Sequence, residues 1–344
     1  MFVSKISNAV KRLKTSDLLY FEEQFMYGHR EILLHYCMQK IPKLDSNMIL
    51  NGSINHGFSY QENMWKMYKK NLRPAKRYVW NDRQMSPYGG TSSVMATGAP
   101  WLYLLSDLGL NSDNIEKTLK KDPKKVIIFP GHNIVSYFKY DITETIENYI
   151  SKIPQGARVT VCLFWLDFCD PSIRKAFQNL GWEVVCMGYV PRLPKPDSTQ
   201  GGRPNFLLEL FTLFADASLM LTDNFSTGVL YALSLNLNLM YIESEQLVEV
   251  EKIGTEILGL VGPRSQGFFN SEKLWIKTYI PEILETNGKP KTFLKFALDE
   301  LGYKNFLENI EGKSFEWVKS QVDGESLELY SQKLNSIKKF ININ

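Results

Sequence analysis

The chain has few of the residues and patterns that mark several large classes of protein. Its 344 residues include only four cysteines, and its formal net charge is +3. That charge is too small to argue for nucleic acid as a partner. No apolar run is long enough to cross a bilayer, and the first residues lack the apolar stretch and cleavage site of a signal peptide. We therefore expect a cytoplasmic protein.

Signs of a metal site are also missing. The cysteines have no metal-ligand spacing, and three of them lie in or beside apolar runs, which is typical of reduced core thiols. They are Cys37, Cys162, Cys169 and Cys186. No Asp-x-Asp pair follows a strand, because Asp167 and Asp170 bracket two residues. The sequence therefore predicts no metal ion and no bound cofactor.

What the chain does contain is a regular alternation of apolar runs and helical segments. A hydrophobic content of 44% and a charged content of 22% are normal for a globular protein. In the second half, apolar strands are expected at 126–129, 158–165, 183–189, 218–221 and 237–242. Helices are expected between them at 142–153, 171–180, 206–215 and 229–235. This order predicts the α/β class with a doubly wound parallel sheet.

The first half is less regular, and the length suits two domains. Strands are expected at 47–54, 77–80 and 93–97, and helices at 22–38 and 101–108. The lysine-rich stretch 120–125 is interpreted as the crossing between domains. We expect an N-terminal domain at 1–118, a second domain at 119–270, and a helical extension at 271–344 that packs back across both.

The first residues form a basic amphipathic pattern. The spacing of Phe2, Val3, Ile6, Val10 and Leu13 predicts that they share one face of a helix, with lysine and arginine around it. Such a helix either rests on the anionic inner face of a membrane or packs on its own domain. Both readings stay open.

The most informative segment runs from 217 to 243. It reads as strand, polar turn, helix and strand, with the turn spanning Thr222 to Gly228. In a parallel sheet such a turn lies at the carboxyl edge, where ligands bind. Ser226 or Thr227 would cap the helix, whose N-terminus attracts phosphate. Asp223 repels phosphate and is expected to cap the turn; the alternative is an ordinary capped turn without a ligand.

Three motifs, in this order, resemble GT-B-type glycosyltransferases that build bacterial surface polysaccharides such as capsule, lipopolysaccharide and teichoic acid. The motifs are Ile54-Asn55-His56-Gly57, then Tyr78-Val79-Trp80 with Thr97-Gly98-Ala99-Pro100, and the turn at 222–228. The resemblance implies two Rossmann-like domains facing a cleft. It also implies a nucleotide-sugar donor and a glycan or lipid-linked acceptor.

The chain departs from that pattern in two ways. Phe58-Ser59 follows His56-Gly57 where the longer acceptor motif has Thr-Pro, and no His-Pro pair of the kind that holds a CMP phosphate is present. The donor nucleotide therefore stays open among CMP, CDP and UDP.

Glycosyl transfer needs a base for the acceptor hydroxyl. His56 suits this role because imidazole titrates near neutrality, and Asp82 and Glu62 are the rival bases. The alternatives are purely structural roles: a hydrogen-bonded histidine at His56 and a helix or turn cap at Asp82.

The donor needs groups that stabilise its phosphate and sugar. The turn residues Asn224, Ser226, Thr227 and Gly228 are assigned to it. So are three residues elsewhere: His132 after a strand, Glu243 for the ribose, and Arg192 in a proline-rich loop. The alternatives for these three are an ordinary turn and solvated surface charges.

Two other functions remain open. One is a non-hydrolysing sugar-nucleotide epimerase of similar fold, which needs several carboxylates for proton transfer. The other is a scaffold protein that kept the fold without catalysis.

Overall fold

The computed structural model describes residues 27–55, 57, 76–88, 92–131, 142–187, 205–242, 264–286, 291–320 and 324–341. The chain forms two compact units, and each is described by itself. The first unit comprises Met1–Thr118, Val190–Thr212 and Lys295–Asn344. The second comprises Leu119–Tyr189 and Leu213–Leu294.

The second unit is built on a five-stranded parallel sheet with the order β7-β6-β5-β8-β9. Its strands are β5 (Asp122–Ile128), β6 (Arg158–Cys162), β7 (Glu183–Val185), β8 (Ala217–Thr222) and β9 (Asn238–Tyr241). The central strands are apolar at successive positions, as in Val126–Ile128, because both faces of the sheet are covered. The predicted α/β class and parallel sheet are confirmed.

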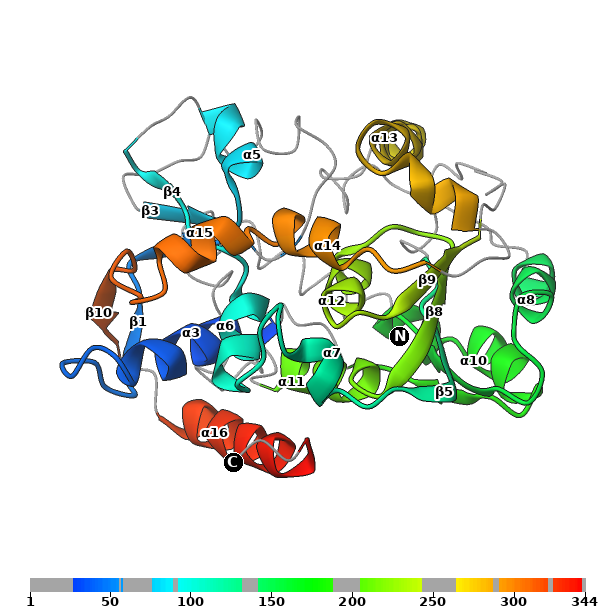
Figure 1. Ribbon diagram of the computed structural model, residues 1–344, viewed down its shortest axis with the longest axis horizontal. Coiled ribbons are helices and arrows are strands. Elements are labelled where there is room, and N and C mark those ends of the chain that lie inside the picture. Colours follow the sequence, from blue (N-terminus) through cyan, green and yellow to red (C-terminus); the bar gives the residue numbers. More distant parts are fainter. Residues whose placement is uncertain are drawn as a thin grey trace, which may run out of the picture. The chain divides into compact units, whose positions relative to one another are not determined.

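Helices cover this sheet on both faces. Ile146 and Tyr149 of α8 (Ile142–Ile150) and Phe177 of α10 (Pro171–Gln178) pack on one face, against Val126 and Val161. Figure 1 shows α12 (Thr227–Ser234) on the other side of β8 and β9. The remaining helices of this unit are α9 (Trp165–Cys169), α13 (Arg264–Tyr279) and the 3-10 helix η3 (Pro281–Thr286). Helix α11 (Phe206–Phe214) spans the division between the units, and its residues up to Thr212 belong to the first.

Local signals explain where α10 begins and ends. Asp170 is its N-cap and accepts a hydrogen bond from the backbone N–H of Ser172 at 2.8 Å. Pro171 occupies the first turn, where a missing N–H costs nothing. Gly181 follows the helix with a φ of 75°, a conformation that favours glycine. The sequence predicted this helix at nearly the same bounds.

The first unit contains a three-stranded parallel sheet, β2-β3-β4, and an antiparallel pair, β1-β10. Its strands are β1 (Met48–Leu50), β2 (Gly52–Ile54), β3 (Lys76–Val79), β4 (Val94–Ala96) and β10 (Trp317–Lys319). The single strand predicted at 47–54 is wrong, because the chain leaves one sheet and enters the other at Gly52. A Cβ at Gly52 would lie 2.1 Å from the Lys76 carbonyl oxygen, so the strands approach too closely for any other residue.

A buried ion pair on α3 (His29–Met38) connects several segments of the first unit. Arg30 on α3 pairs with Glu31 at 3.0 Å and donates to the carbonyls of Met48 and Ser46. The hydroxyl of Ser326 on α16 donates to the same Glu31 carboxylate at 2.9 Å, which ties the C-terminal helix to α3. The helices are α3 (His29–Met38), α5 (Asp82–Met85), α6 (Pro100–Asp107), α7 (Ile115–Thr118), α14 (Leu294–Glu300), α15 (Tyr303–Glu308) and α16 (Glu325–Phe340), with the 3-10 helix η2 (Ser86–Tyr88).

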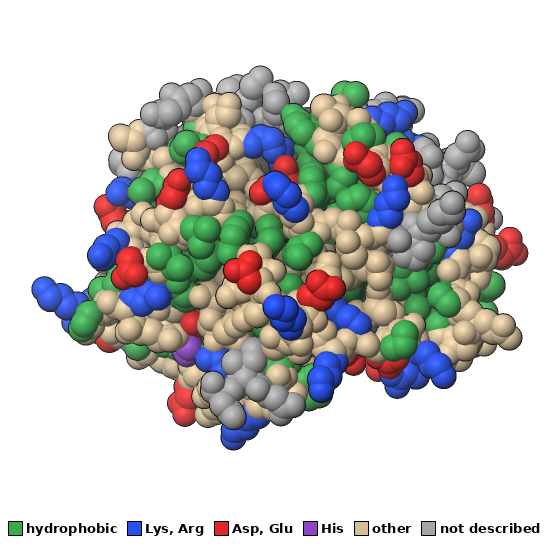
Figure 2. Space-filling view, in the orientation of Figure 1, with side chains coloured by type: hydrophobic (Ala, Val, Ile, Leu, Met, Phe, Trp, Pro, Cys, Tyr) green, Lys and Arg blue, Asp and Glu red, His purple; other side chains and the backbone are tan. Residues whose placement is uncertain are grey.

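Charges of both signs are interspersed over the face shown in Figure 2, in keeping with the small net charge. Across the described ranges, no helix combines the length and the apolar composition that a membrane span requires. The basic N-terminal segment lies outside the described residues.

Candidate functional site

The strand order of the second unit contains a topological switch point. From β5 the chain proceeds to β6 and β7 on one side, and then returns to β8 and β9 on the other. The loops that follow β5 and β8 therefore diverge at the carboxyl edge of the sheet. In open α/β sheets this divergence forms the crevice in which ligands bind.

Two hydrogen bonds join these loops. The backbone N–H of Gly131, after β5, donates to Asp223 Oδ1 at 2.6 Å. The hydroxyl of Thr222, the last residue of β8, lies 2.6 Å from the Phe129 carbonyl oxygen. Asp223 thus holds the neighbouring loop, whereas the sequence suggested that it caps its own turn. Burial raises the pKa of Asp223, and the Gly131 N–H acts in the opposite direction.

A second buried carboxylate holds the turn from the other side. Glu272 on α13 is 2% exposed. Its Oε1 accepts from the Phe225 backbone N–H at 2.5 Å, and its Oε2 accepts from Asn224 Nδ2 at 2.9 Å. Burial, with a smaller contribution from the charge of Asp223, raises the pKa of Glu272 to about 7. The turn is therefore held by one carboxylate on each side.

Sequence analysis missed Glu272. A signal was present, since the glutamate stands three and four positions before Trp275 and Ile276, which are both buried. Residues at this spacing share one face of a helix. A carboxylate on an apolar helix face is a candidate for a buried functional group.

The predicted strand, turn, helix and strand are confirmed around Ser226. This residue is the N-cap of α12, with extended backbone at φ −117° and ψ 174°, yet its side chain makes no capping hydrogen bond. The hydroxyl is buried and has no hydrogen-bond partner among the described residues. The helix therefore begins without the side-chain cap that the sequence suggested, and its partial positive charge is not offset by Ser226.

Gly228 serves packing at the same helix start. A Cβ at this position would lie 2.6 Å from Phe129 Cζ, so the ring after β5 fits only against a glycine. The contact brings the first turn of α12 close to the end of β5. Thr227, the first residue of the helix, is half-buried.

The carboxyl edge of the small sheet in the first unit centres on Asn55, the residue before His56. Asn55 is 2% exposed. Its Oδ1 accepts from Arg77, its Nδ2 donates to Gln84, and its carbonyl accepts from the Trp80 indole at 2.9 Å. These contacts fix the side chain and the backbone of Asn55.

The C-terminal segment covers the rest of that edge. Asn81 Nδ2 donates to the Glu300 carbonyl at 2.7 Å, and Ala99 N donates to the Leu301 carbonyl at 2.8 Å. A Cβ at Gly302 would lie 1.8 Å from the Trp80 carbonyl oxygen, so the segment lies directly on the strand end. The motif at 97–100 therefore contacts the C-terminal segment of the protein.

Asp82 lies beside this covered region. It is exposed, belongs to the first turn of α5, and accepts from Asn305 Nδ2 at 3.0 Å. Asn81 is the N-cap of the same helix, through its Oδ1 and the Gln84 N–H. The contacts of Asp82 are those of a helix start that anchors α15.

Five assigned residues lie outside the described residues: His56, Glu62, His132, Arg192 and Glu243. Their roles stay predictions.

Within the described ranges, no three His, Cys, Asp or Glu side chains are grouped so that they could hold a metal ion. The four cysteines are free thiols, and burial raises the pKa of Cys37 to about 12.

No model of a protein family and no curated protein matches the chain. Among solved structures, it is similar to a complex of S. aureus MnaA with UDP, at 15% identity and a TM-score of 0.28, over 78% of this chain and 60% of that one. It is also similar to the UDP-GlcNAc 2-epimerase of Neisseria meningitidis bound to UDP-GlcNAc, at 15% identity and a TM-score of 0.31, over 71% and 64%.

A third similar structure is the wall teichoic acid polymerase TagF, at 9% identity and a TM-score of 0.30, over 82% of this chain and 62% of that one. The chain spans less than two thirds of each of these three chains.

Proposed function

We propose that this chain is a glycosyltransferase that moves a sugar from a nucleotide-sugar donor to a glycan or lipid-linked acceptor. The observation that carries the proposal is the construction of the switch-point edge. Asp223 and Glu272 hold the β8–α12 turn through Gly131, Asn224 and Phe225. The helix behind that turn starts without a side-chain cap.

This construction suits a phosphate. The helix start provides partial positive charge, and the Ser226 hydroxyl is a donor that the described protein groups do not use. Asn224, Ser226, Thr227 and Gly228 would surround the donor phosphates. His132, Arg192 and Glu243 remain the proposed contacts to the rest of the donor.

Transfer requires an acceptor base, and His56 is the proposed one. The residue before it in the sequence, Asn55, is held at a strand end by side-chain and backbone hydrogen bonds. A base must keep its position relative to the attacking hydroxyl, and a rigid support provides this. Glu62 and Asp82 are the alternative bases. The order of the sequence motifs supports transfer over other uses of a nucleotide.

The test has two stages. The first is a thermal-shift screen with CMP-, CDP-, UDP- and GDP-linked sugars, since a ligand that binds only the folded state raises the melting temperature. The second measures release of free nucleotide with and without a glycan acceptor. We expect release only with acceptor. Conversion of the sugar nucleotide in the absence of acceptor would instead indicate an epimerase, and no shift with any of them would contradict a nucleotide site.

Matched variants separate the two halves of the reaction. His56→Ala should abolish transfer and leave the thermal shift unchanged. Ser226→Ala combined with Thr227→Ala should reduce the thermal shift itself. Normal turnover in His56→Ala would exclude this base and direct the test to Asp82 and Glu62.

A further inference from the structure

Glu272 accepts hydrogen bonds from three donors, and one of them belongs to a residue assigned to the donor phosphates. The Phe225 N–H and the Tyr241 hydroxyl reach Oε1, at 2.5 Å and 3.4 Å. Asn224 Nδ2 reaches Oε2 at 2.9 Å. The carboxylate therefore determines which way the Asn224 amide faces.

In this arrangement the NH2 group of Asn224 is directed at Glu272, and its carbonyl oxygen is on the opposite side. A carbonyl oxygen is an acceptor and repels the oxygens of a phosphate. If Glu272 is protonated, its O–H becomes a donor, and the amide is better satisfied with Oδ1 toward Glu272. The NH2 group then faces the opposite way, where it can donate to an anion.

We propose that protonation of Glu272 reverses the Asn224 amide and presents its NH2 group to the donor phosphates, so that nucleotide-sugar binding takes up one proton. The inference rests on the function proposed above. The proton comes from solvent and bonds to Glu272 Oε2. The resulting O–H group donates a hydrogen bond to Asn224 Oδ1, and no bond in the ligand changes. Glu272 is a positioning residue, because it acts through Asn224.

The charges around Glu272 favour the same direction. Asp223 opposes its ionisation, and Lys273 on the same helix favours it. Tyr241 on β9 and the Phe225 N–H stabilise the carboxylate by hydrogen bonds. With the pKa at about 7, the free protein holds both forms at neutral pH. A phosphate anion nearby adds negative charge and shifts Glu272 toward its protonated form.

The experiment is calorimetric titration of the full chain with UDP-glucose, CDP-glucose, GDP-glucose and CMP-sialic acid. None of these ligands has a terminal phosphate, so the ligand itself does not titrate near neutrality, unlike a free nucleotide. Titrations at about pH 8 in two buffers of different ionisation enthalpy give the number of protons taken up. We expect uptake approaching one proton, and an affinity roughly three- to tenfold weaker at about pH 8 than at about pH 6.5.

Glu272→Gln imitates the protonated form, because its amide NH2 can donate to Asn224 Oδ1 and its oxygen can still accept from the Phe225 N–H. This variant should bind as tightly at about pH 8 as the wild type does at about pH 6.5, without proton uptake. Asn224→Ala should bind more weakly at both pH values. Glu183→Gln, at the other edge of the same sheet, is the matched control and should behave as the wild type.

The outcomes separate the two proposals. Binding without proton uptake or pH dependence overturns this inference and leaves the nucleotide site standing. Weaker binding of Glu272→Gln at every pH also overturns it, since that is the result for a merely structural carboxylate. Absence of binding with all four sugar nucleotides overturns the proposed function and this inference together.

Discussion

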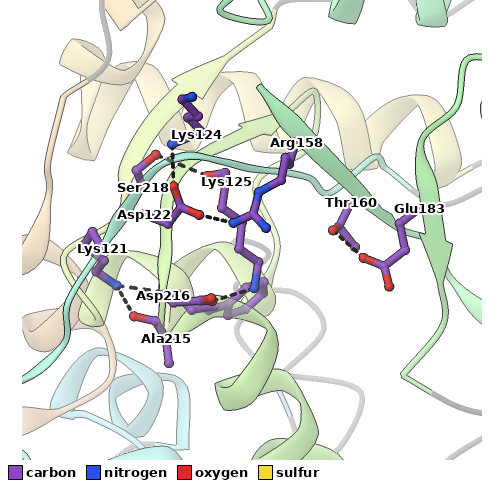
Figure 3. A network of polar contacts seen from close by, with 11 residues as sticks. Lys121, Asp122, Lys124, Lys125, Arg158, Thr160, Glu183, Ala215, Asp216 and Ser218 are labelled. Carbon is purple, nitrogen blue, oxygen red and sulfur yellow. Dashed lines mark hydrogen bonds and ion pairs between the residues drawn. The ribbon is translucent and has the colours of Figure 1, made fainter. Parts of the chain in front are cut away.

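The carboxylates at the two edges of the five-stranded sheet have different kinds of partner. At the amino edge, shown in Figure 3, carboxylates meet cations: Asp216 pairs with Lys125 at 2.5 Å, and Asp122 pairs with Arg158. At the carboxyl edge, Asp223 and Glu272 are buried and bonded to neutral donors. Both edges belong to the same strands, so the difference does not come from strand packing.

The amino edge has the charge pairs of a stabilising surface, whereas the carboxyl edge has the buried carboxylates expected of a binding site. Paired, partly exposed charges shield each other and are typical of a stable surface. Buried carboxylates without a cation keep raised pKa values and are typical of sites that bind or react. The amino edge has one unusual group of its own: burial lowers the pKa of Lys121 to about 7, although its Nζ donates to the Ala215 carbonyl at 2.9 Å.

The largest effect is expected from removing the carboxylate that holds the turn. Glu272→Ala leaves the buried Phe225 N–H without its acceptor and opens space beside α13, which should cost about 2–3 kcal/mol of unfolding free energy. Urea denaturation measures it. Asp216→Ala at the amino edge is the control and should cost less than about 1 kcal/mol. Equal costs for the two variants would remove the contrast between the edges.

The edges should also respond oppositely to pH. The folded-state pKa of Glu272 is about 7, above its ordinary 4.5, so the folded state holds the extra proton and stability falls as pH rises between these values. The folded-state pKa of Lys121 is about 7, below its ordinary 10.5, so stability rises with pH above about 7.

Denaturant midpoints across this range test the pH response in matched variants. Glu272→Gln should remove most of the loss of stability that occurs as pH rises from about 4.5 to about 7. Lys121→Met should remove most of the gain in stability that occurs as pH rises above about 7. Glu183→Gln should change neither pH dependence. If Glu272→Gln still loses stability as pH rises toward 7, the loss comes from another buried carboxyl, such as Asp223 or Glu300, whose pKa values burial also raises.

A smaller effect is expected from overpacking the helix start. Gly228→Ala places a methyl group against the Phe129 ring, which must move, at a cost of about 1 kcal/mol or more. Phe129→Leu should relieve the strain, so the double variant should lose less than the sum of the single ones. Additive losses in a double-mutant cycle would show that the ring and Gly228 are independent.

The smallest effect is expected at the exposed pair of the amino edge. Arg158 is 71% exposed and pairs with Asp122 at the surface, where solvent and salt screen the charges. Arg158→Ala should leave the thermal midpoint and the nucleotide response unchanged. A clear loss of stability would mean that the amino edge is more than a screened surface.

Much of the second unit could be predicted from local patterns. The helix at 171–178 follows from Asp170, Pro171 and Gly181, and the βαβ order at 217–241 follows from two apolar runs around a polar turn. These signals act between near neighbours in the chain, so one sequence is enough to read them. The strand predicted at 47–54 failed because Gly52 approaches Lys76 across a sheet, which no local pattern reports.

The sequence by itself determined the fold class, the polar turn before α12 and the residue types in that turn. Only the tertiary structure decided which groups hold that turn. Gly131 and Asp223 are 92 positions apart, and Asn224 and Glu272 are 48 apart. Periodicity and capping depend on a few neighbouring residues, whereas these contacts depend on strand order and helix packing. The spacing of Glu272 to Trp275 and Ile276 indicates that it is buried, but only the folded chain shows which groups it contacts.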